Sequence, residues 1–360
     1  MGRRRGQQLF TPVKKRHTGL WVSLALVFFV VAAIFLLNNA LNARPALLSQ
    51  RVSVPGIDKR LENFSILHIS DLHGACFGRE QENLARLIAR EEYQAVCLTG
   101  DLVGKGGDMQ PFLELVQLFQ GKAPVYFIAG DDDPEPILTT PHGGIEVKAP
   151  YVRAAESLGA VYVDVPVRQE VQGLSVWFCP EVLFGVDIDQ AMFSAAENRD
   201  AILNSDNPYS PESGALLRAA EYRLEAIALA KQAQTDMKAD DLCVLLTHAP
   251  PGRDDVQRMK AEREGAQHGR YYPGRLALIL AGHINNGQFR LPWLGAVYLP
   301  RLIDQEAGFR PGAKASGLFS VLGVPVYISP GLGVSGAYAL PLRMFNRPAV
   351  TRVTLTAQII

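Results

Sequence analysis

The sequence is poor in cysteine, and its few cysteines do not have the spacing of a metal-binding motif. The four stand far apart, at Cys76, Cys97, Cys179 and Cys243. Cys97 and Cys243 fall inside apolar runs, where a free thiol behaves as a small buried hydrophobe. We therefore expect no cysteine-based metal centre and have no reason to predict a disulfide.

Acidic residues are missing from the first 43 positions, which carry six of the 36 basic residues. The other 317 residues hold 30 basic and 36 acidic side chains, a net charge of −6. Internal repeats and low-complexity tracts are absent as well. This charge balance does not provide the basic surface that nucleic acids require, so no nucleic-acid partner is expected.

Charge of either sign is absent between Leu20 and Leu37, where only Ser23 is polar. A helix of this length can cross a hydrocarbon core of roughly 30 Å. A buried core helix is disfavoured because no face of the segment is polar. A cleaved signal peptide is an alternative, but its apolar region is normally shorter and no small-residue cleavage pair follows. We favour an uncleaved membrane anchor over residues 20–37.

The basic cluster precedes this anchor and so predicts the topology. By the positive-inside rule, residues 1–19 form a cytoplasmic tail and the large domain lies outside the cell membrane. Residues 38–58, with two prolines, are interpreted as a linker. The chain is thus expected to be a single-pass protein with the bilayer as a partner and a large extracytoplasmic domain over residues 59–360.

Apolar runs in the large domain predict strands, and helical patterns separate the first of them. Helices are expected at Glu80–Glu91 and near Gln110–Gln120. This alternation is typical of an α/β domain whose helices cover the sheet faces. Later short runs predict a second sheet, giving a two-sheet β-sandwich core flanked by helices. The strands are expected at Ile66–Ile69, Ala95–Thr99, Val125–Ile128, Leu242–Leu246, Leu276–Leu280, Leu318–Leu322, Pro325–Ile328 and Ala349–Leu355.

Residues 199–239 interrupt the alternation of strands and helices. They are polar and rich in turn residues as far as Gly214, and strongly helical from there to Ala239. Two interpretations stay open. The segment is an inserted arm or cap outside the shared core, or a solvated crossover helix with no part in the chemistry.

Five of the predicted strands end at a short motif of metal-binding residue types. In an open α/β sheet, the loops beyond the carboxyl ends of the strands form the ligand site. Carboxylates and imidazoles delivered there would converge on one point, and such a cluster favours metal. The pattern predicts a metal-dependent hydrolase. The motifs are Asp71-Leu-His73, Gly100-Asp101, Gly130-Asp131-Asp132-Asp133, Thr247-His248 and Gly282-His283.

In their order, these motifs resemble the calcineurin-like metallophosphoesterase family. The family pattern is D-x-H, G-D, G-N-H-[DE], H and G-H-x-H on a two-sheet α/β sandwich, and the match runs from about Phe64 to the carboxyl terminus. The segment from Gly282 to Pro292 further resembles a membrane-associated bacterial phosphodiesterase branch. So do the segments at 329–333 and 342–348.

The resemblance implies a site for two divalent ions, with Mn²⁺ favoured and Fe or Zn as alternatives. Asp71 and His73 would bind the first ion, and His248 and His283 the second. Asp101 would bridge both. Two cations held in this way can clamp a phosphoryl group and share a hydroxide nucleophile.

Three positions depart from the family pattern. Asp131 replaces an asparagine ligand of the second ion, a change that keeps an oxygen donor. Asn285 replaces a histidine ligand of the first ion, so this site is expected to be looser. Asp132 replaces the histidine that stabilises the transition state and protonates the leaving group.

Asp132 should be a poor general acid, because two nearby cations depress the pKa of a carboxyl group. Two alternatives follow: Asp132 serves as a further metal ligand, and His142 or His268 supplies the proton. The interpretation that we favour is an enzyme that hydrolyses a phosphodiester, phosphomonoester or pyrophosphate and prefers leaving groups that need little protonation. The alternative is an impaired homologue that binds metal or a phosphorylated ligand as a sensor or scaffold. The substrate class is a phosphorylated small molecule or lipid, and the sequence does not indicate an oligomeric state.

Overall fold

The computed structural model describes residues 18–184, 186–264, 273–300, 303, 306–336, 338 and 342–357. The chain divides into two units, Met1–Leu41 and Asn42–Ile360. In the first unit, helix α1 (Thr18–Asn42) contains the predicted anchor. Its length and apolar composition suit a membrane span and equally a signal sequence near the N-terminus. Most of the predicted basic tail lies outside the described residues.

In the second unit, the first sheet has six strands in the order β1-β16-β2-β3-β4-β5. Strands β2 to β5 are parallel, whereas β16 runs antiparallel to β2 and parallel to β1. The predicted strands in this sheet are confirmed. Their bounds are β1 (Ala46–Ser53), β2 (Ser65–Ile69), β3 (Ala95–Thr99), β4 (Val125–Ile128), β5 (Ala160–Tyr162) and β16 (Ala349–Thr356).

Two expectations about this sheet are wrong. Residues 46–53, inside the predicted linker, form strand β1, which pairs along its whole length with β16. Strand β16, predicted for the second sheet, belongs to the first, because its other edge pairs with β2. The pairing of Ala46 with Ala349 joins distant parts of the chain, and no local sequence pattern predicts it.

The second sheet also has six strands, in the order β14-β15-β9-β8-β7-β6. Its four central strands are parallel, and both edge strands are antiparallel to their neighbours. The strands are β6 (Val167–Val171), β7 (Leu174–Pro180), β8 (Leu242–Thr247), β9 (Arg275–Ala281), β14 (Gly317–Val321) and β15 (Val324–Ile328). Two short hairpins follow β9: β10 (Arg290–Leu291) with β11 (Gly295–Ala296), and β12 (Tyr298–Leu299) with β13 (Gly308–Phe309).

Apolar side chains from both sheets form one buried cluster, so the sheets pack face to face as predicted. The Tyr126 ring of β4 stacks on the Phe178 ring of β7, with centroids 4.1 Å apart. The outer face of the first sheet packs on α2 (Glu82–Ile88), α3 (Gln110–Gln117) and α4 (Pro150–Ser157). The outer face of the second sheet packs on α6 (Pro211–Asp236) and α7 (Arg253–Glu264). The domain is a mixed α/β fold of two parallel-rich sheets flanked by helices.

Helix α2 is shorter than the predicted Glu80–Glu91. Glu80 and Gln81 have positive φ angles of 50° and 59°, so a regular helix cannot begin before Glu82. The buried Gln81 side chain accepts a hydrogen bond from the Phe77 amide and donates to the Ala75 carbonyl. These local bonds hold the chain in a turn instead.

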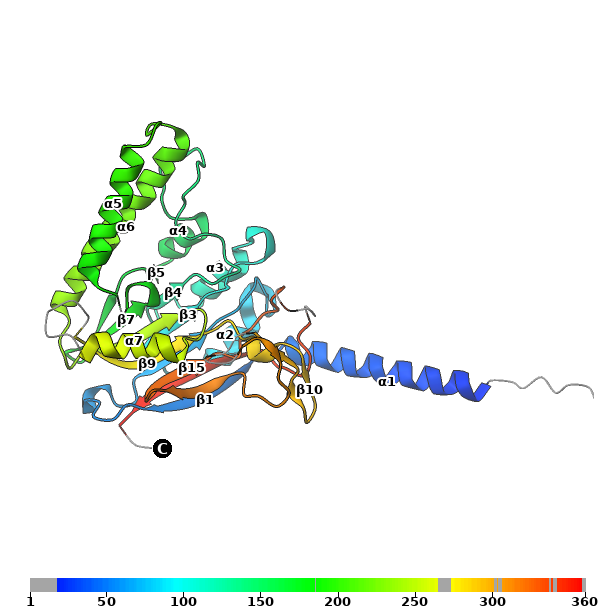
Figure 1. Cartoon of the computed structure of the whole chain (residues 1–360). Coiled ribbons are helices and arrows are strands. Elements are labelled where there is room, and N and C mark those ends of the chain that lie inside the picture. The colour runs from blue at the N-terminus through cyan, green and yellow to red at the C-terminus, as the bar shows by residue number, and fades with distance from the viewer. Residues whose placement is uncertain are drawn as a thin grey trace, which may run out of the picture. The chain divides into compact units, whose positions relative to one another are not determined.

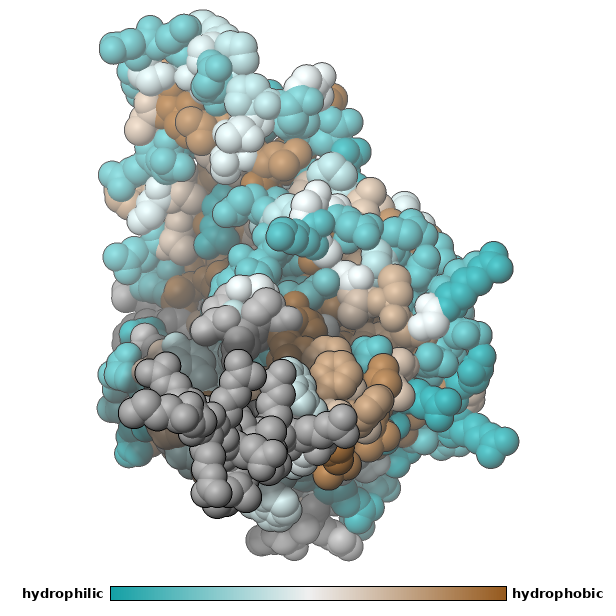
Figure 2. Space-filling model, turned by 90° about the vertical axis from the view of Figure 1, so that its right-hand side faces the viewer, coloured by the Kyte–Doolittle hydropathy of each residue, from teal (hydrophilic) through white to brown (hydrophobic). Residues whose placement is uncertain are grey.

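The predicted insertion at 199–239 begins inside helix α5 (Ile188–Leu203) and contains all of α6; the two helices pack together and project from the domain (Figure 1). In Figure 2 the upper part of the molecule carries brown apolar side chains among teal polar ones; Phe193, Leu203 and Leu229 are exposed on these helices. The expectation that residues 199–239 lie outside the shared core is wrong for the second half of α6. There Ile227, Ala230 and Ala233 are buried against the second sheet.

Candidate metal centre

The predicted ligands stand directly after the carboxyl ends of five parallel strands, and the structure brings them together from both sheets. The loops after β2, β3 and β4 carry Asp71 with His73, Asp101 and Asp131. The loops after β8 and β9 carry His248 and His283. Because the central strands of each sheet are parallel, their carboxyl ends share one edge, where side chains from both sheets meet.

Six of these side chains form two groups whose ligand atoms lie within 4.8 Å of one another. The first group is Asp71, His73 and Asp101, and the second is Asp131, His248 and His283. In the second group, the His283 Nδ1 atom is 3.3 Å from both His248 Nε2 and Asp131 Oδ2. Three carboxylates and three imidazoles are a donor set that fits divalent Mn, Fe or Zn.

Asp101 lies between the two groups. Its Oδ2 atom is 3.5 Å from His73 Nε2 and 3.2 Å from His248 Nε2, and it is only 3% exposed. Its other oxygen, Oδ1, accepts a hydrogen bond of 2.8 Å from the Asp132 amide. One carboxylate oxygen therefore faces ligands of both groups, as a bridging ligand must.

The backbone of the site is strained. Asp71, His73, Asp101 and His283 have φ angles of 52°, 45°, 54° and 69°, in the left-handed region that non-glycine residues rarely adopt. Hydrogen bonds hold this geometry: the Asp71 amide donates to the Gly100 carbonyl and the His73 amide to the Asp101 carbonyl. Such strain persists only where the surrounding structure enforces it, and it is concentrated at functional sites.

Two glycines let the loops approach closely. A Cβ atom at Gly100 would lie 2.5 Å from the Nδ1 atom of His248, and one at Gly130 would lie 2.3 Å from the Asp101 carboxylate. Both distances are shorter than any real carbon contact. The glycines before Asp101 and Asp131 are therefore required by the packing of the site.

The electrostatics of the protein alone favour positive charge at the centre. Burial raises the pKa of Asp71. Burial also acts to raise the pKa of Asp101, but the hydrogen bond and charge of His248 outweigh it, so this pKa is lowered. For His248, burial disfavours the imidazolium, yet the hydrogen bond that its ring donates to Asp101 and the nearby carboxylates raise its pKa to about 10. A metal ion bound there would take the place of this proton, because a ligand histidine must be neutral.

Asn285, predicted as a ligand of the first ion, turns its amide nitrogen toward the first group. Its Nδ2 atom donates to Asp71 Oδ1 at 3.2 Å and lies 3.5 Å from His73 Nε2. Its oxygen faces the Nη1 atom of Arg343 at 3.5 Å. An amide nitrogen is a hydrogen-bond donor, so in this orientation Asn285 supports Asp71.

Arg343 is a neighbour that sequence reasoning missed. Its side chain is buried and donates to the carbonyls of Pro330, Gly331, Gly333 and Asn346. Burial lowers its pKa to about 10, so it stays charged at neutral pH. The only sequence signal was its place in the 342–348 segment, which has no metal-binding residue type.

Asp132 lies beside the first group with its side chain partly exposed. Its Oδ2 atom is 3.5 Å from His73 Nδ1 and accepts a hydrogen bond of 3.2 Å from the Ser335 hydroxyl. A carboxylate on the far nitrogen of a ligand histidine orients the ring and raises its basicity. The position at which the family pattern has a proton-donating histidine thus carries a carboxylate that faces a ligand.

Asp133 is a structural residue of the same loop. Its carboxylate accepts hydrogen bonds from the amides of Leu102, Val103 and Gly130, at 2.7, 2.7 and 2.9 Å. It therefore ties the loop after β3 to the loop after β4. Burial raises its pKa to about 6. Its place in the acidic triplet was a visible signal for this role.

The two histidines considered as alternative proton donors do not join the described cluster. His142 lies on the loop between β4 and α4, with Nε2 3.7 Å from Glu146. His268 lies outside the described residues.

A family model described as calcineurin-like phosphoesterase matches residues 64–286 of the chain. No curated protein matches it. Among solved structures, the chain is similar to the phosphopantetheinyl hydrolase (PptH) of Mycobacterium tuberculosis. The two are 14% identical, with 74% of this chain and 89% of that chain covered and a TM-score of 0.36.

Proposed function

Because the chain belongs to the calcineurin-like phosphoesterase family, and so to the metal-dependent phosphoester hydrolases, we propose that it works with two divalent ions and is anchored in a membrane by α1. The observation that carries the two-ion proposal is the pair of donor groups on either side of Asp101. When bound, two such ions hold a phosphoryl group and lower the pKa of the attacking water.

The six clustered side chains take the binding roles in this proposal. Asp71, His73 and Asp101 hold the first ion, and Asp131, His248 and His283, with Asp101, hold the second. Mn²⁺ is our first choice because carboxylate donors favour it, with Fe and Zn as competitors for the imidazoles. Asn285 supports Asp71 from outside the ligand set.

Asp132 leaves the reaction without the usual proton donor. Its carboxylate lies 3.5 Å from His73 and accepts a hydrogen bond from Ser335, so it orients a ligand histidine where the family pattern has a proton donor. We therefore propose substrates whose leaving group departs without protonation, such as a pyrophosphate or an activated phosphodiester.

The experiment is metal analysis of the purified full-length protein, combined with hydrolysis of bis-p-nitrophenyl phosphate and p-nitrophenyl phosphate with added Mn²⁺, Fe²⁺ or Zn²⁺. We expect two ions per chain and hydrolysis that EDTA abolishes. Bound metal without hydrolysis of either ester would favour the second candidate, a metal-binding sensor or scaffold. The observation in favour of that candidate is the pairing of the Asp132 carboxylate with the Ser335 hydroxyl. Absence of bound metal would refute both.

The proposed topology places the catalytic domain outside the cell membrane, with the bilayer as a partner. Protease treatment of intact spheroplasts tests it. Digestion of the domain from outside is expected. Protection of the domain would place it in the cytoplasm and make intracellular phosphorylated precursors the leading substrates.

A further inference from the structure

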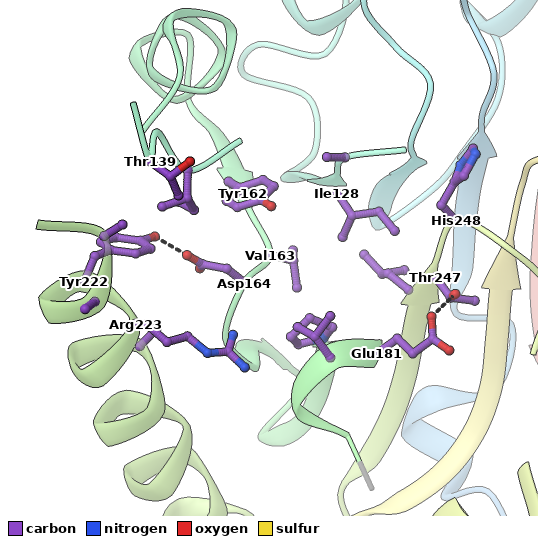
Figure 3. A pocket seen from close by; sticks show the side chains of 18 of the residues that line it. Ile128, Thr139, Tyr162, Val163, Asp164, Glu181, Tyr222, Arg223, Thr247 and His248 are labelled. Atoms are coloured by element: carbon purple, nitrogen blue, oxygen red, sulfur yellow. Dashed lines mark hydrogen bonds between the residues drawn. The ribbon is translucent and has the colours of Figure 1, made fainter. Parts of the chain in front are cut away.

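A cavity of about 660 Å³ opens beside the second donor group, and Asp131 and His248 are part of its wall. Figure 3 shows the space between α6, the loop after β5 and the end of β8, with His248 at one side. The volume lies within the range of roughly 300–1,000 Å³ that is usual for ligand sites. A group attached to a phosphate at the metal centre can therefore extend into this cavity.

The wall of the cavity is mainly apolar. Aliphatic side chains come from the sheets, from the loop after β5 and from the insertion, including Ile128, Val163, Ile202, Leu216 and Leu246. Two pairs of polar residues satisfy each other: the Thr247 hydroxyl donates to Glu181, and the Tyr222 hydroxyl to Asp164. Burial raises the pKa of Glu181. The cavity offers hydrocarbon contact more than hydrogen bonds.

Helix α6 builds the outer wall with one face. Leu216, Ala219, Ala220, Arg223 and Ala226 line the cavity, and their spacing of three and four residues puts them on one side of a helix. The three alanines leave room that larger side chains would fill. This helix belongs to the insertion, so the insertion shapes the surroundings of the metal centre.

Arg223 extends from α6 into the same space (Figure 3). Of the described residues that line the cavity, it is the only arginine or lysine, and no described carboxylate pairs with it. Arg223 is exposed, so its guanidinium lies at the end of the cavity that is open to solvent, whereas most of the cavity wall is apolar. From this position the guanidinium can donate a hydrogen bond to a polar oxygen of a ligand whose phosphate lies at the metal centre.

We propose that this cavity holds the hydrocarbon part of an amphiphilic phosphoester, with the phosphate at the metal centre and Arg223 on a polar oxygen near the chain. The proposal rests on the proposed function, because it names the substrate class of that site. An apolar chain is favoured over a nucleoside because the wall is mainly aliphatic and two pairs of its polar side chains, Thr247 with Glu181 and Tyr222 with Asp164, already bond to each other.

The test compares two phosphodiesters with one leaving group, hexadecyl p-nitrophenyl phosphate and methyl p-nitrophenyl phosphate, on the full-length protein in nonionic detergent micelles. Ala219→Trp fills the cavity, and Ala228→Trp is the matched control at an exposed position of the same helix. We expect the wild type to prefer the hexadecyl ester at least tenfold in kcat/KM. Ala219→Trp should reduce that preference to less than twofold, whereas Ala228→Trp should change the rate of neither ester.

A second measurement does not depend on turnover. A diazirine-bearing hexadecyl phosphate is photolysed with the metal-free protein, and the labelled peptides are mapped. Labelling of α6 near Leu216–Ala226 that Ala219→Trp abolishes supports the proposal, even if the protein hydrolyses no ester and the proposed function fails. The proposal is overturned if α6 is labelled equally in the wild type, Ala219→Trp and Ala228→Trp. It is also overturned if α6 is not labelled at all. Hydrolysis of the methyl ester without any chain preference overturns it too, and leaves the phosphoesterase standing.

Discussion

The two donor groups around Asp101 differ in how deeply their side chains are buried. In the first group, Asp71 and Asp101 are buried and the His73 side chain is 7% exposed. In the second, the side chains of Asp131 and His283 are 70% and 28% exposed, whereas His248 is buried, and Asp131 and His248 line the cavity. Both departures at catalytic positions, Asp132 and Asn285, lie beside the buried group. The first group is thus enclosed by the protein more completely than the second.

The largest effect is expected from Asp101→Asn. Both donor groups share this carboxylate, so the substitution should affect both of them. We expect loss of both ions and of hydrolysis, beyond the ~10–100-fold that removal of an outer partner of a metal site costs. Metal analysis and kcat/KM measure it. Asp200→Asn, at an exposed position of α5, is the control and should match the wild type. Retention of one tightly bound ion would mean that the groups are independent.

A gain is expected from Asp132→His, which supplies a proton donor on the edge of the buried group. General acid catalysis contributes roughly 10²–10⁴-fold, so esters with poor leaving groups should be cleaved that much faster. Activated esters should change little. The measurement is kcat/KM against leaving-group pKa, with Asp132→Asn as the variant that removes the carboxylate without adding an acid. If kcat/KM depends on the leaving-group pKa in the same way in the wild type and in Asp132→His, another group already donates the proton.

A smaller effect is expected at Asn285. Asn285→Ala removes the donor to Asp71 and should weaken binding of one ion by about 10–100-fold, with the other ion unaffected. Asn285→His offers a nitrogen ligand and should tighten the same ion, in spite of the close packing of Asn285 against Gly331. Titration of the apo protein with Mn²⁺ separates the two sites. Equal weakening of both ions by Asn285→Ala would contradict the local role.

The smallest effect concerns stability and a histidine that binds no metal. His68 of β2 is buried, and burial lowers its pKa to about 3, so the folded protein holds it neutral. The unfolded chain takes up a proton near pH 6.5, so stability should fall as the pH drops from about 6.5 toward 3. The slope due to His68 approaches roughly 1.4 kcal/mol per pH unit.

Denaturation of the wild type and of His68→Leu between pH 4 and 8 measures this contribution. The difference between them should shrink as the pH falls, since only the wild type carries the buried imidazole. A constant difference would show that His68 is protonated in the folded state.

The positions of the six clustered side chains could be read from the sequence, because each follows an apolar run and stands in a motif whose residue types bind metal. Asp101 and Asp131 also follow a glycine, a local sign of the close approach that the structure requires. The orientation of Asn285 could not be read in this way. It depends on Arg343, which lies 58 residues further along the chain and reaches the site only after folding.

The cavity was beyond sequence reasoning for a related reason. The helical content of residues 214–239 was visible, but the burial of Ile227 and Ala230 against the second sheet depends on packing between distant segments. The alanines that line the cavity are equally compatible with a solvated helix. Only the position of α6 over the end of β8 gives them a function.

The pairing of β1 with β16 has a consequence for the synthesis of the protein. Strand β1 is the first strand of the domain to leave the ribosome and β16 the last, and β16 fills the place between β1 and β2. Until residues 349–356 have been made, β1 has no partner and one edge of β2 is open. Open strand edges are sites of aggregation. A chain released early, short of β16, would therefore keep its metal-binding loops and still be a poor candidate for a soluble product.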